Sequence, residues 1–194
     1  NNKSLSDQEL FSILGLKRPT MFFRTEFTPK IYQHDIQNII GYYKINGFLD
    51  VKIISQYETK SNQYIHITHN IEEGTQYQFN KLIISGNKFL SKKQISLYFQ
   101  EGIDSHYNPT FIRNQLLKIK KEYLRNGKLD VFIQEEHIID GHDITLRINI
   151  SEGIHYRIKD IHILGLGTVD KKYISREIIF KVGEIYNIDK IDLT

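Results

Sequence analysis

The chain has 194 residues, of which 40% are hydrophobic and none is cysteine. The lack of cysteine excludes disulfides, thiolate metal sites and cysteine nucleophiles, and no apolar run approaches the roughly 20 residues that a membrane helix needs. Lys and Arg number 26 against 23 Asp and Glu, a balance that argues against a surface built for nucleic-acid phosphates. The chain begins with Asn rather than Met, and we expect it to be a fragment of a longer protein.

The first long element that the pattern predicts is a helix, which a β-hairpin follows. One face of the helix carries apolar residues at steps of 4, 3 and 4, which is typical of an amphipathic helix: Tyr32, Ile36, Ile39 and Tyr43. Asn46-Gly47 supplies the left-handed residue that commonly ends a helix. Alternating apolar residues then predict the two hairpin strands: Val51 and Ile53, followed by Ile65, Ile67 and Ile71.

The middle of the chain contains a longer set of predicted elements. Phe79–Ser85 is predicted to be a strand that ends at the turn Gly86-Asn87. Ser91 is placed to cap a short helix, and Asn108-Pro109 starts a longer one, because Asn caps well and Pro fits the first turn. Two alternating strands joined at Asp140-Gly141-His142 predict a second hairpin.

These stretches are copies of one unit, because their motifs return at a nearly constant interval. Tyr107-Asn108 recurs 79 residues later as Tyr186-Asn187. Glu73-Gly74-x-x-Tyr77 also recurs 79 residues later, as Glu152-Gly153-x-x-Tyr156. A fixed period of this kind indicates a structural unit that is copied in tandem.

We predict that the unit is a β-α-α-β-β module of the α+β class. Its three-stranded mixed sheet is covered on one face by two helices, since each helix must bury one apolar face. We expect a first copy over residues 1–76 that lacks its first strand, a complete copy over residues 77–155, and the N-terminal part of a third copy over residues 156–194. Truncated copies expose strand edges, so we also expect edge-to-edge pairing between molecules.

The repeated motifs together resemble POTRA domains, the polypeptide-transport-associated repeats. The similarity rests on Gly86-Asn87 after a strand, Tyr107-Asn108 before the second helix, Tyr123-x-x-x-Gly127 at its end, and the closing Glu152-Gly153-x-x-Tyr156. It covers essentially the whole chain, and tandem copies resemble the soluble arm of the BamA family of outer-membrane β-barrel assembly factors.

The resemblance implies a non-enzymatic arm without a cofactor, on the periplasmic side of the outer membrane. It also implies that a membrane β-barrel follows in the same chain. The partners that it implies are unfolded outer-membrane proteins and accessory assembly lipoproteins or chaperones.

In this family the strand after the second helix is an exposed sheet edge, which implies an edge at Leu129–His137 and its counterpart Leu49–Tyr57. An extended client peptide can add to such an edge through backbone hydrogen bonds. The strand period turns Phe132 and Gln134 outward. The candidate client-binding residues in the two copies are Val131, Phe132, Ile133, Gln134, Val51, Lys52 and Ile53.

The links between copies are short and contain no stretch rich in Ser and Pro. We therefore expect them to hold neighbouring copies within a limited range of angles. The candidate junction residues are the repeated motif itself: Glu73, Gly74, Tyr77, Glu152, Gly153 and Tyr156.

Other kinds of site are weaker interpretations of the same residues. His66 and His69 are three apart on a predicted strand and face opposite sides, so no metal site is expected. Asp50 and Asp130 recur in separate copies, which argues against a catalytic carboxylate pair. Two alternatives stay open: the POTRA arm of a two-partner secretion or translocation-assembly transporter, and an RNA-binding α+β module that stacks bases on Tyr64 or Phe132.

Overall fold

The structure is a computed structural model that describes residues 3–18, 20, 25–61, 64–165 and 170–192. It divides into two compact units. The first comprises residues 1–80, 102–111 and 139–144, and the second comprises residues 81–101, 112–138 and 145–194, apart from the positions outside the described ranges. The division falls inside the predicted middle copy, so each unit contains one of the two predicted junctions.

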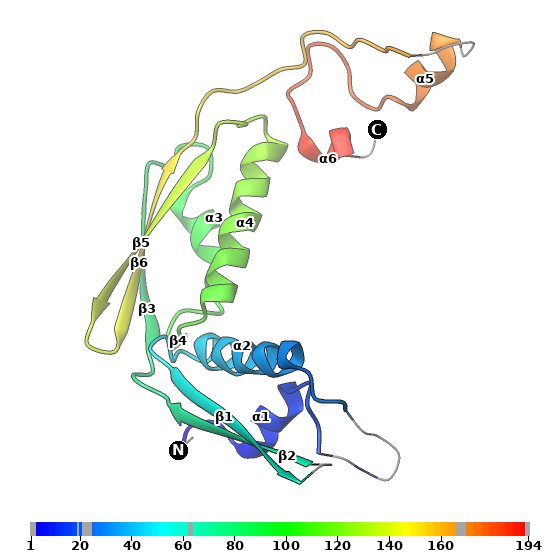
Figure 1. Cartoon of the computed structure of the whole chain (residues 1–194). Helices are drawn as coiled ribbons and strands as arrows, with labels where there is room; N and C mark the ends of the chain where they lie inside the picture. The colour runs from blue at the N-terminus through cyan, green and yellow to red at the C-terminus, as the bar shows by residue number, and fades with distance from the viewer. Residues whose placement is uncertain (1–2, 19, 21–24, 62–63, 166–169, 193–194) are drawn as a thin grey trace. The chain divides into compact units, whose positions relative to one another are not determined.

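The first repeat lies in the first unit and consists of α1 (Asp7–Ile13), α2 (Pro29–Ile45), β1 (Lys52–Ser61) and β2 (Tyr64–Glu72) (Figure 1). Ser6 and Glu9 form a capping box at the start of α1, and the side chain of Thr28 caps α2. The strands β1 and β2 pair antiparallel, with Ile53 opposite Ile71. The predicted helix and hairpin are therefore both present.

The predicted apolar stripe of α2 supplies the core of the first repeat. Tyr32, Ile39 and Tyr43 are buried, and Ile36 is half-buried. Each large apolar side chain removed from water contributes roughly 1.5–3 kcal/mol. The buried cluster joins both helices to the sheet and consists of Leu10, Ile39, Tyr43, Phe48, Val51 and Ile71.

The middle repeat consists of β3 (Gln78–Ser85), α3 (Lys92–Leu97), β4 (Ser105–His106), α4 (Pro109–Arg125), β5 (Phe132–Asp140) and β6 (Asp143–Ser151). Its sheet has the strand order β4-β3-β6-β5, so it has four strands rather than the three predicted. The additional strand β4 is two residues long and pairs antiparallel with the start of β3. A strand this short has no readable period, which is why the sequence pattern missed it.

The helices α3 and α4 lie against one face of this sheet (Figure 1). The face of α4 with Ile112, Ile119 and Tyr123 is buried, as the stripe predicts. The clean alternation predicted for β6 is also present, because every second residue is almost fully buried: Ile144, Leu146, Ile148 and Ile150. The two-layer α+β class is thus confirmed.

The third repeat contains α5 (Lys171–Glu177) and α6 (Ile188–Asp192) among its described residues. The sequence predicts a first strand here, because Ile161 and Ile163 match the apolar positions Leu82 and Ile84 of β3 at the 79-residue period. That expectation is wrong for the described part, where residues 156–165 form only an isolated bridge between Arg157 and Ile185. In the middle repeat β6 holds β3 in place, and no described strand takes that position beside residues 156–165.

Candidate functional sites: a strand edge and two repeat junctions

The strand β5 lies at one end of the strand order of the middle sheet. It begins at Phe132 and ends at Asp140, about three residues later at each end than the predicted Leu129–His137. The start is later because the chain turns after α4, where the Val131 N–H donates to the Lys128 carbonyl at 3.3 Å. Val131, one of the candidate residues, therefore precedes the strand.

The candidate side chains at and just before the start of β5 differ in burial. Val131 is 5% exposed and Ile133 is half-buried, whereas Gln134 is exposed and Phe132 is 63% exposed. Arg147 of β6 donates to the Glu136 carboxylate across the hairpin at 2.7 Å. The edge thus combines an exposed ring with a polar outer face.

The equivalent edge of the first repeat differs at two positions. Val51 is buried and precedes β1, and Ile53 is half-buried. Lys52 is exposed where the middle repeat has Phe132, and Ile54 is 64% exposed where the middle repeat has Gln134. A Lys on a strand edge discourages pairing with further strands. The two edges are therefore unequal candidates for binding a peptide, and β5 is the stronger.

The glutamates of the two Glu-Gly-x-x-Tyr motifs act inside their own repeats. The Glu152 carboxylate accepts the N–H groups of Lys88 and Phe89 at 2.5 and 2.7 Å, and the Tyr123 hydroxyl at 3.0 Å. It thereby ties the turn after β3 to α4 and to the end of β6. Glu152 is a candidate junction residue, but these partners all belong to the middle repeat. Its contacts therefore do not join two repeats directly.

Glu73 has the same set of partners in the first repeat. It accepts the N–H groups of Lys3 and Ser4 at 2.8 and 3.0 Å, and the Tyr43 hydroxyl at 3.1 Å. Sequence reasoning missed this role, although a signal existed. A Glu follows the helix Tyr at nearly the same interval in both copies, from Tyr43 to Glu73 and from Tyr123 to Glu152.

These contacts hold the two carboxylates ionised. Burial alone would raise the pKa of Glu152, but the N–H groups of Lys88 and Phe89, the Tyr123 hydroxyl and the charge of Lys128 together lower it below its usual value. At Glu73 burial again raises the pKa, and the hydrogen bonds from Ser4, Lys3 and Tyr43 outweigh it, so that the pKa is lowered. Burial, followed by the hydrogen bond to Glu152, raises the pKa of Tyr123 well above its ordinary value. The phenol is therefore a donor at every physiological pH.

The tyrosines of the motifs make the contacts between repeats. The Tyr77 hydroxyl donates to the Asp50 carboxylate at 2.7 Å, and the Tyr156 hydroxyl donates to Asp130 at 2.6 Å. The recurring aspartates thus serve as acceptors at the junctions.

Two backbone hydrogen bonds extend each contact, and we call this pair the junction ladder. The Tyr77 N–H donates to the Gly47 carbonyl at 2.8 Å, and the Tyr107 N–H donates to the Tyr77 carbonyl at 2.9 Å. At the second junction the Tyr156 N–H donates to Gly127 at 2.8 Å, and the Tyr186 N–H donates to Tyr156 at 3.0 Å. The repeated Tyr, Gly and Tyr-Asn motifs therefore meet at one place in each unit.

Gly47 and Gly127 allow the chain segments of each junction ladder to approach closely. A Cβ on Gly47 would lie 2.7 Å from the Tyr77 carbonyl oxygen, and a Cβ on Gly127 would lie 2.9 Å from that of Tyr156. Both glycines also have positive φ, where other residues are strained.

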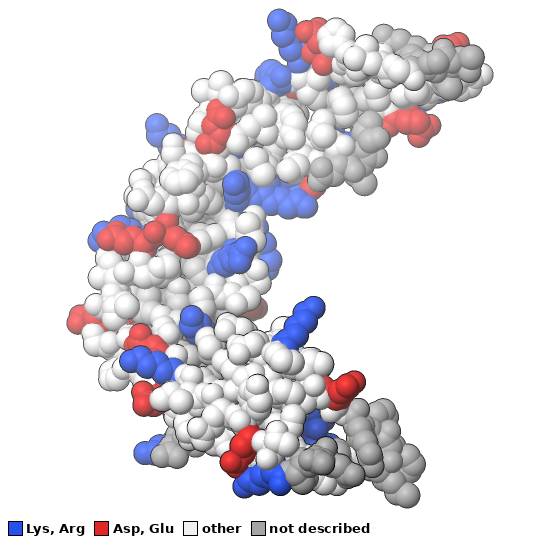
Figure 2. All heavy atoms as spheres, viewed as in Figure 1, with Lys and Arg blue, Asp and Glu red and all other residues white. Residues whose placement is uncertain are grey.

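Among the described residues no group of three His, Asp, Glu or Cys side chains gathers as metal ligands would. On the face shown in Figure 2, basic and acidic side chains are interspersed. None of the helices in the described part of the chain is long and apolar enough to cross a membrane.

The fold and its junctions define a class of protein, in which small α+β modules follow one another through short hydrogen-bonded links. Residues 77–153 match the family described as "POTRA: Surface antigen variable number repeat". The chain is 30% identical to the outer membrane protein assembly factor BamA of Buchnera aphidicola over 162 residues, which are 74% of this chain and 25% of that protein. It is 20% identical to a putative outer membrane protein assembly factor of Treponema pallidum, over 97% of this chain and 24% of that protein.

A solved structure shares the fold over nearly the whole chain. The crystal structure of POTRA3-5 of Haemophilus influenzae BamA aligns with 99% of this chain and 78% of that one, with a TM-score of 0.69 at 17% identity. The chain therefore consists of tandem POTRA repeats of the BamA family. It spans about a quarter of the length of the curated relatives that it matches.

Proposed function

We propose that these repeats form part of the periplasmic arm of an outer-membrane β-barrel assembly factor and bind unfolded outer-membrane proteins at β5. The observation that carries the proposal is the position of β5 at the edge of its sheet, with Phe132 exposed beside it. The arm is not catalytic, and the membrane β-barrel of the same protein follows it in sequence.

Backbone pairing suits a receptor of many clients. An edge strand offers N–H and C=O groups that an extended peptide meets whatever its side chains, so affinity comes without a sequence requirement. The strands of outer-membrane barrels alternate apolar and polar residues. One apolar face of such a strand is able to contact Phe132.

Accessory assembly lipoproteins or chaperones are the other partners that we propose for the arm. Open edges are also surfaces on which two copies of the chain pair with each other. Light scattering of the chain over a range of concentrations measures that self-association separately from client binding.

The test uses a proline in the edge strand. Ile133→Pro removes an N–H from β5 and is hostile to pairing, and the matched control Ile53→Pro makes the same change in β1. The probe is a synthetic peptide with the sequence of one transmembrane strand of an outer-membrane protein, titrated while backbone amide NMR shifts are followed. We expect Ile133→Pro to weaken binding about tenfold or more, since the loss of one or two backbone hydrogen bonds is enough for that.

Ile53→Pro leaves the peptide affinity unchanged under this proposal. The amide signals of β6 in Ile133→Pro report whether the middle sheet is still formed. Unchanged peptide affinity with those signals in place would exclude β5 as the site.

A further inference from the structure

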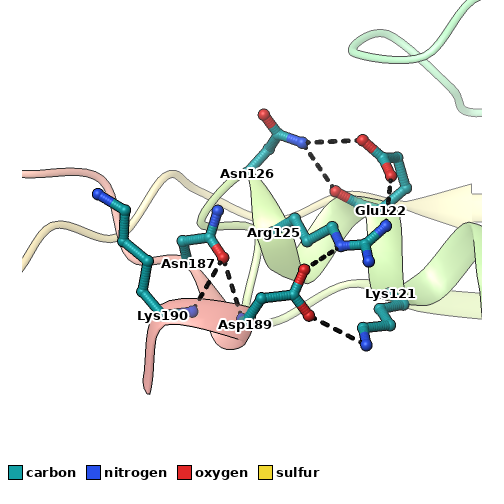
Figure 3. Close-up of polar contacts among 7 residues, drawn as sticks. All are labelled: Lys121, Glu122, Arg125, Asn126, Asn187, Asp189 and Lys190. Carbon is teal, nitrogen blue, oxygen red and sulfur yellow. Dashed lines mark hydrogen bonds and ion pairs between the residues drawn. The ribbon is translucent and has the colours of Figure 1, made fainter. Parts of the chain in front are cut away.

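The second junction carries a cluster of charged side chains in addition to its ladder. Arg125 Nε donates to the Asp189 carboxylate at 2.5 Å, and Lys121 Nζ lies 3.0 Å from the other oxygen of the same carboxylate (Figure 3). Lys121 and Arg125 belong to the last turns of α4 in the middle repeat, whereas Asp189 belongs to α6 of the third. One carboxylate therefore bridges two cations of the preceding repeat.

Neighbouring contacts hold both sides of this cluster in position. Glu122 accepts from Arg125 Nη1 at 3.3 Å, and the Asn126 amide donates to the Glu122 carbonyl at 2.9 Å. On the other side, the Asn187 side chain accepts the N–H of Asp189 at 3.0 Å. Hydrogen bonds from Lys121 and then Arg125 lower the pKa of Asp189, so the carboxylate stays charged at neutral pH.

The first junction has the ladder but not this cluster of three charged side chains. The end of α2 recurs 80 residues later at the end of α4, since Tyr43 and Gly47 match Tyr123 and Gly127. In this register Lys121 and Arg125 correspond to Gly41 and Ile45. In the 79-residue register of the following motif, Asp189 corresponds to Thr110. The two junctions are therefore alike in backbone and different in electrostatics.

We propose that Lys121, Arg125 and Asp189 form an ionic latch that sets the orientation of the third repeat on the end of α4. Its consequence is that the second junction loosens as salt concentration rises, while the first junction does not respond. The latch acts on orientation rather than on folding, because exposed ion pairs contribute little to stability one at a time. Cations also suit the C-terminal end of a helix, where the helix dipole is negative.

Salt gives a direct way to weaken such a latch. The distance over which charges interact falls from about 10 Å at 0.1 M salt to about 3 Å at 1 M. The ladder hydrogen bonds of Tyr156 and Tyr186 are short-range contacts of neutral groups. Salt therefore separates the contribution of the charges from that of the ladder.

The experiment measures the distance between two nitroxide labels by pulsed electron paramagnetic resonance. The chain has no cysteine, so labels attach only where Cys is introduced. Asn114→Cys on α4 and Glu177→Cys on α5 report on the second junction, and both positions are exposed. Gln37→Cys on α2, combined with Asn114→Cys, reports on the first.

Charge reversal distinguishes the latch from general effects of mutation. Asp189→Lys alone, and Lys121→Glu with Arg125→Glu, each place like charges together, and we expect either change to broaden the second-junction distance distribution on the order of twofold. The triple variant combines Lys121→Glu, Arg125→Glu and Asp189→Lys and so restores opposite charges. We expect its distance distribution to be as narrow as that of the unaltered chain. Glu136→Lys is the matched control. It breaks the ion pair between Arg147 and Glu136, whose charged atoms are 2.7 Å apart and which does not belong to the junction.

In the unaltered chain, 1 M salt should broaden the second-junction distribution toward that of Asp189→Lys and leave the first-junction distribution unchanged. Recovery in the triple variant cannot come from an unfolded third repeat, so it supports the latch directly. The proposal is overturned if the charge-reversed variants keep the narrow distribution, if the triple variant fails to restore it, or if salt affects both junctions equally.

Discussion

The first and middle repeats share one backbone plan, yet their cores have different chemistry. In the first repeat the Tyr32 hydroxyl donates to Ser55 Oγ at 2.6 Å, and Ser55 Oγ lies 2.8 Å from His69 Nδ1. Two of the equivalent positions in the middle repeat are the buried Ile112 and Ile148. The repeated motifs therefore set the path of the chain, while the buried side chains differ between the copies.

The residue after the helix-ending Gly differs in the same manner. Phe48 is buried, with its ring edge-on to Tyr43 at 5.6 Å between centroids. At the equivalent position Lys128 is buried, and its Nζ lies 3.2 Å from the Gly153 carbonyl and 3.8 Å from the Glu152 carboxylate. The glutamate of the middle repeat therefore neutralises a buried cation, which the glutamate of the first repeat does not.

The largest expected difference comes from removing these two glutamates. Glu152→Ala leaves Lys128 buried without its countercharge and should cost about 3–5 kcal/mol. Glu73→Ala leaves only hydrogen-bond donors unpaired and should cost about 1–3 kcal/mol. Hydrogen exchange read by mass spectrometry, on peptides from β5 and β6 and from β1 and β2, measures each repeat by itself.

Glu136→Ala serves as a control for these variants, because Glu136 is exposed in its ion pair with Arg147. It should change protection by less than about 1 kcal/mol. Equal losses in Glu152→Ala and Glu73→Ala would show that Lys128 does not depend on its partner.

A smaller difference is expected from the glycines of the Glu-Gly motif. Gly153 has a φ of +67° and Gly74 a φ of +75°, so an Ala at either position should cost about 1–2 kcal/mol from backbone strain. A Cβ on Gly153 would also lie 2.8 Å from the Asp130 Cβ, against 3.0 Å between Gly74 and Asp50. We expect Gly153→Ala to be the more damaging of the two in the same exchange measurement.

Gly141→Ala separates strain from crowding. Gly141 has a φ of +59°, and nothing lies within 4 Å of the position that its Cβ would take. If Gly153→Ala costs no more than Gly141→Ala, the approach to Asp130 is not a constraint on this position.

The smallest expected difference is a pH dependence confined to the first repeat. Burial lowers the pKa of His69 below its ordinary 6.5, and the nearby Asp35 charge offsets this only in part. The unfolded chain therefore takes up a proton near pH 6.5, while the folded repeat resists it. The contribution of neutral His69 to the stability of the first repeat is fully present above that pH and is lost as the pH falls through the folded pKa. The loss is about 1.4 kcal/mol for each unit by which the folded pKa lies below the unfolded pKa.

Exchange protection of β1 and β2 at pH 7.5 and 5.5, corrected for the intrinsic exchange rate, measures this loss. His69→Ile copies the residue of the middle repeat and should abolish the pH dependence. If the variant keeps the same dependence, another titrating group of the first repeat is responsible.

Several parts of the fold could be predicted from the sequence because they depend on local pattern. The stripe from Ile112 to Tyr123 identifies a helix with one buried face, and Ser91 marks a helix start because its hydroxyl accepts a nearby N–H. The alternation from Ile144 to Ile150 identifies a strand with one buried face. Each of these signals lies within a few residues of the element that it describes.

Other parts could not be predicted, since they depend on contacts between distant residues. The two-residue β4 forms because the chain after Gly102 returns to Gln78 and Phe79. The burial of Lys128 depends on Glu152 and Gly153, which lie more than twenty residues further along the chain. In the described part of the third repeat, apolar alternation at Ile161 and Ile163 gives no strand, since a strand also needs a neighbour.

The sequence alone was enough to predict the period, the long helices, the two hairpins and the tyrosines at each junction, because these follow from repeated local patterns. The contacts of the repeated residues could be assigned only from the folded structure. It assigned Glu73 and Glu152 to the interior of their repeats, and Tyr77 and Tyr156 to the contacts between repeats. Hydrogen bonds and ion pairs form between groups that folding brings within a few ångströms of each other. The spacing of residues along the chain does not reveal which groups these are.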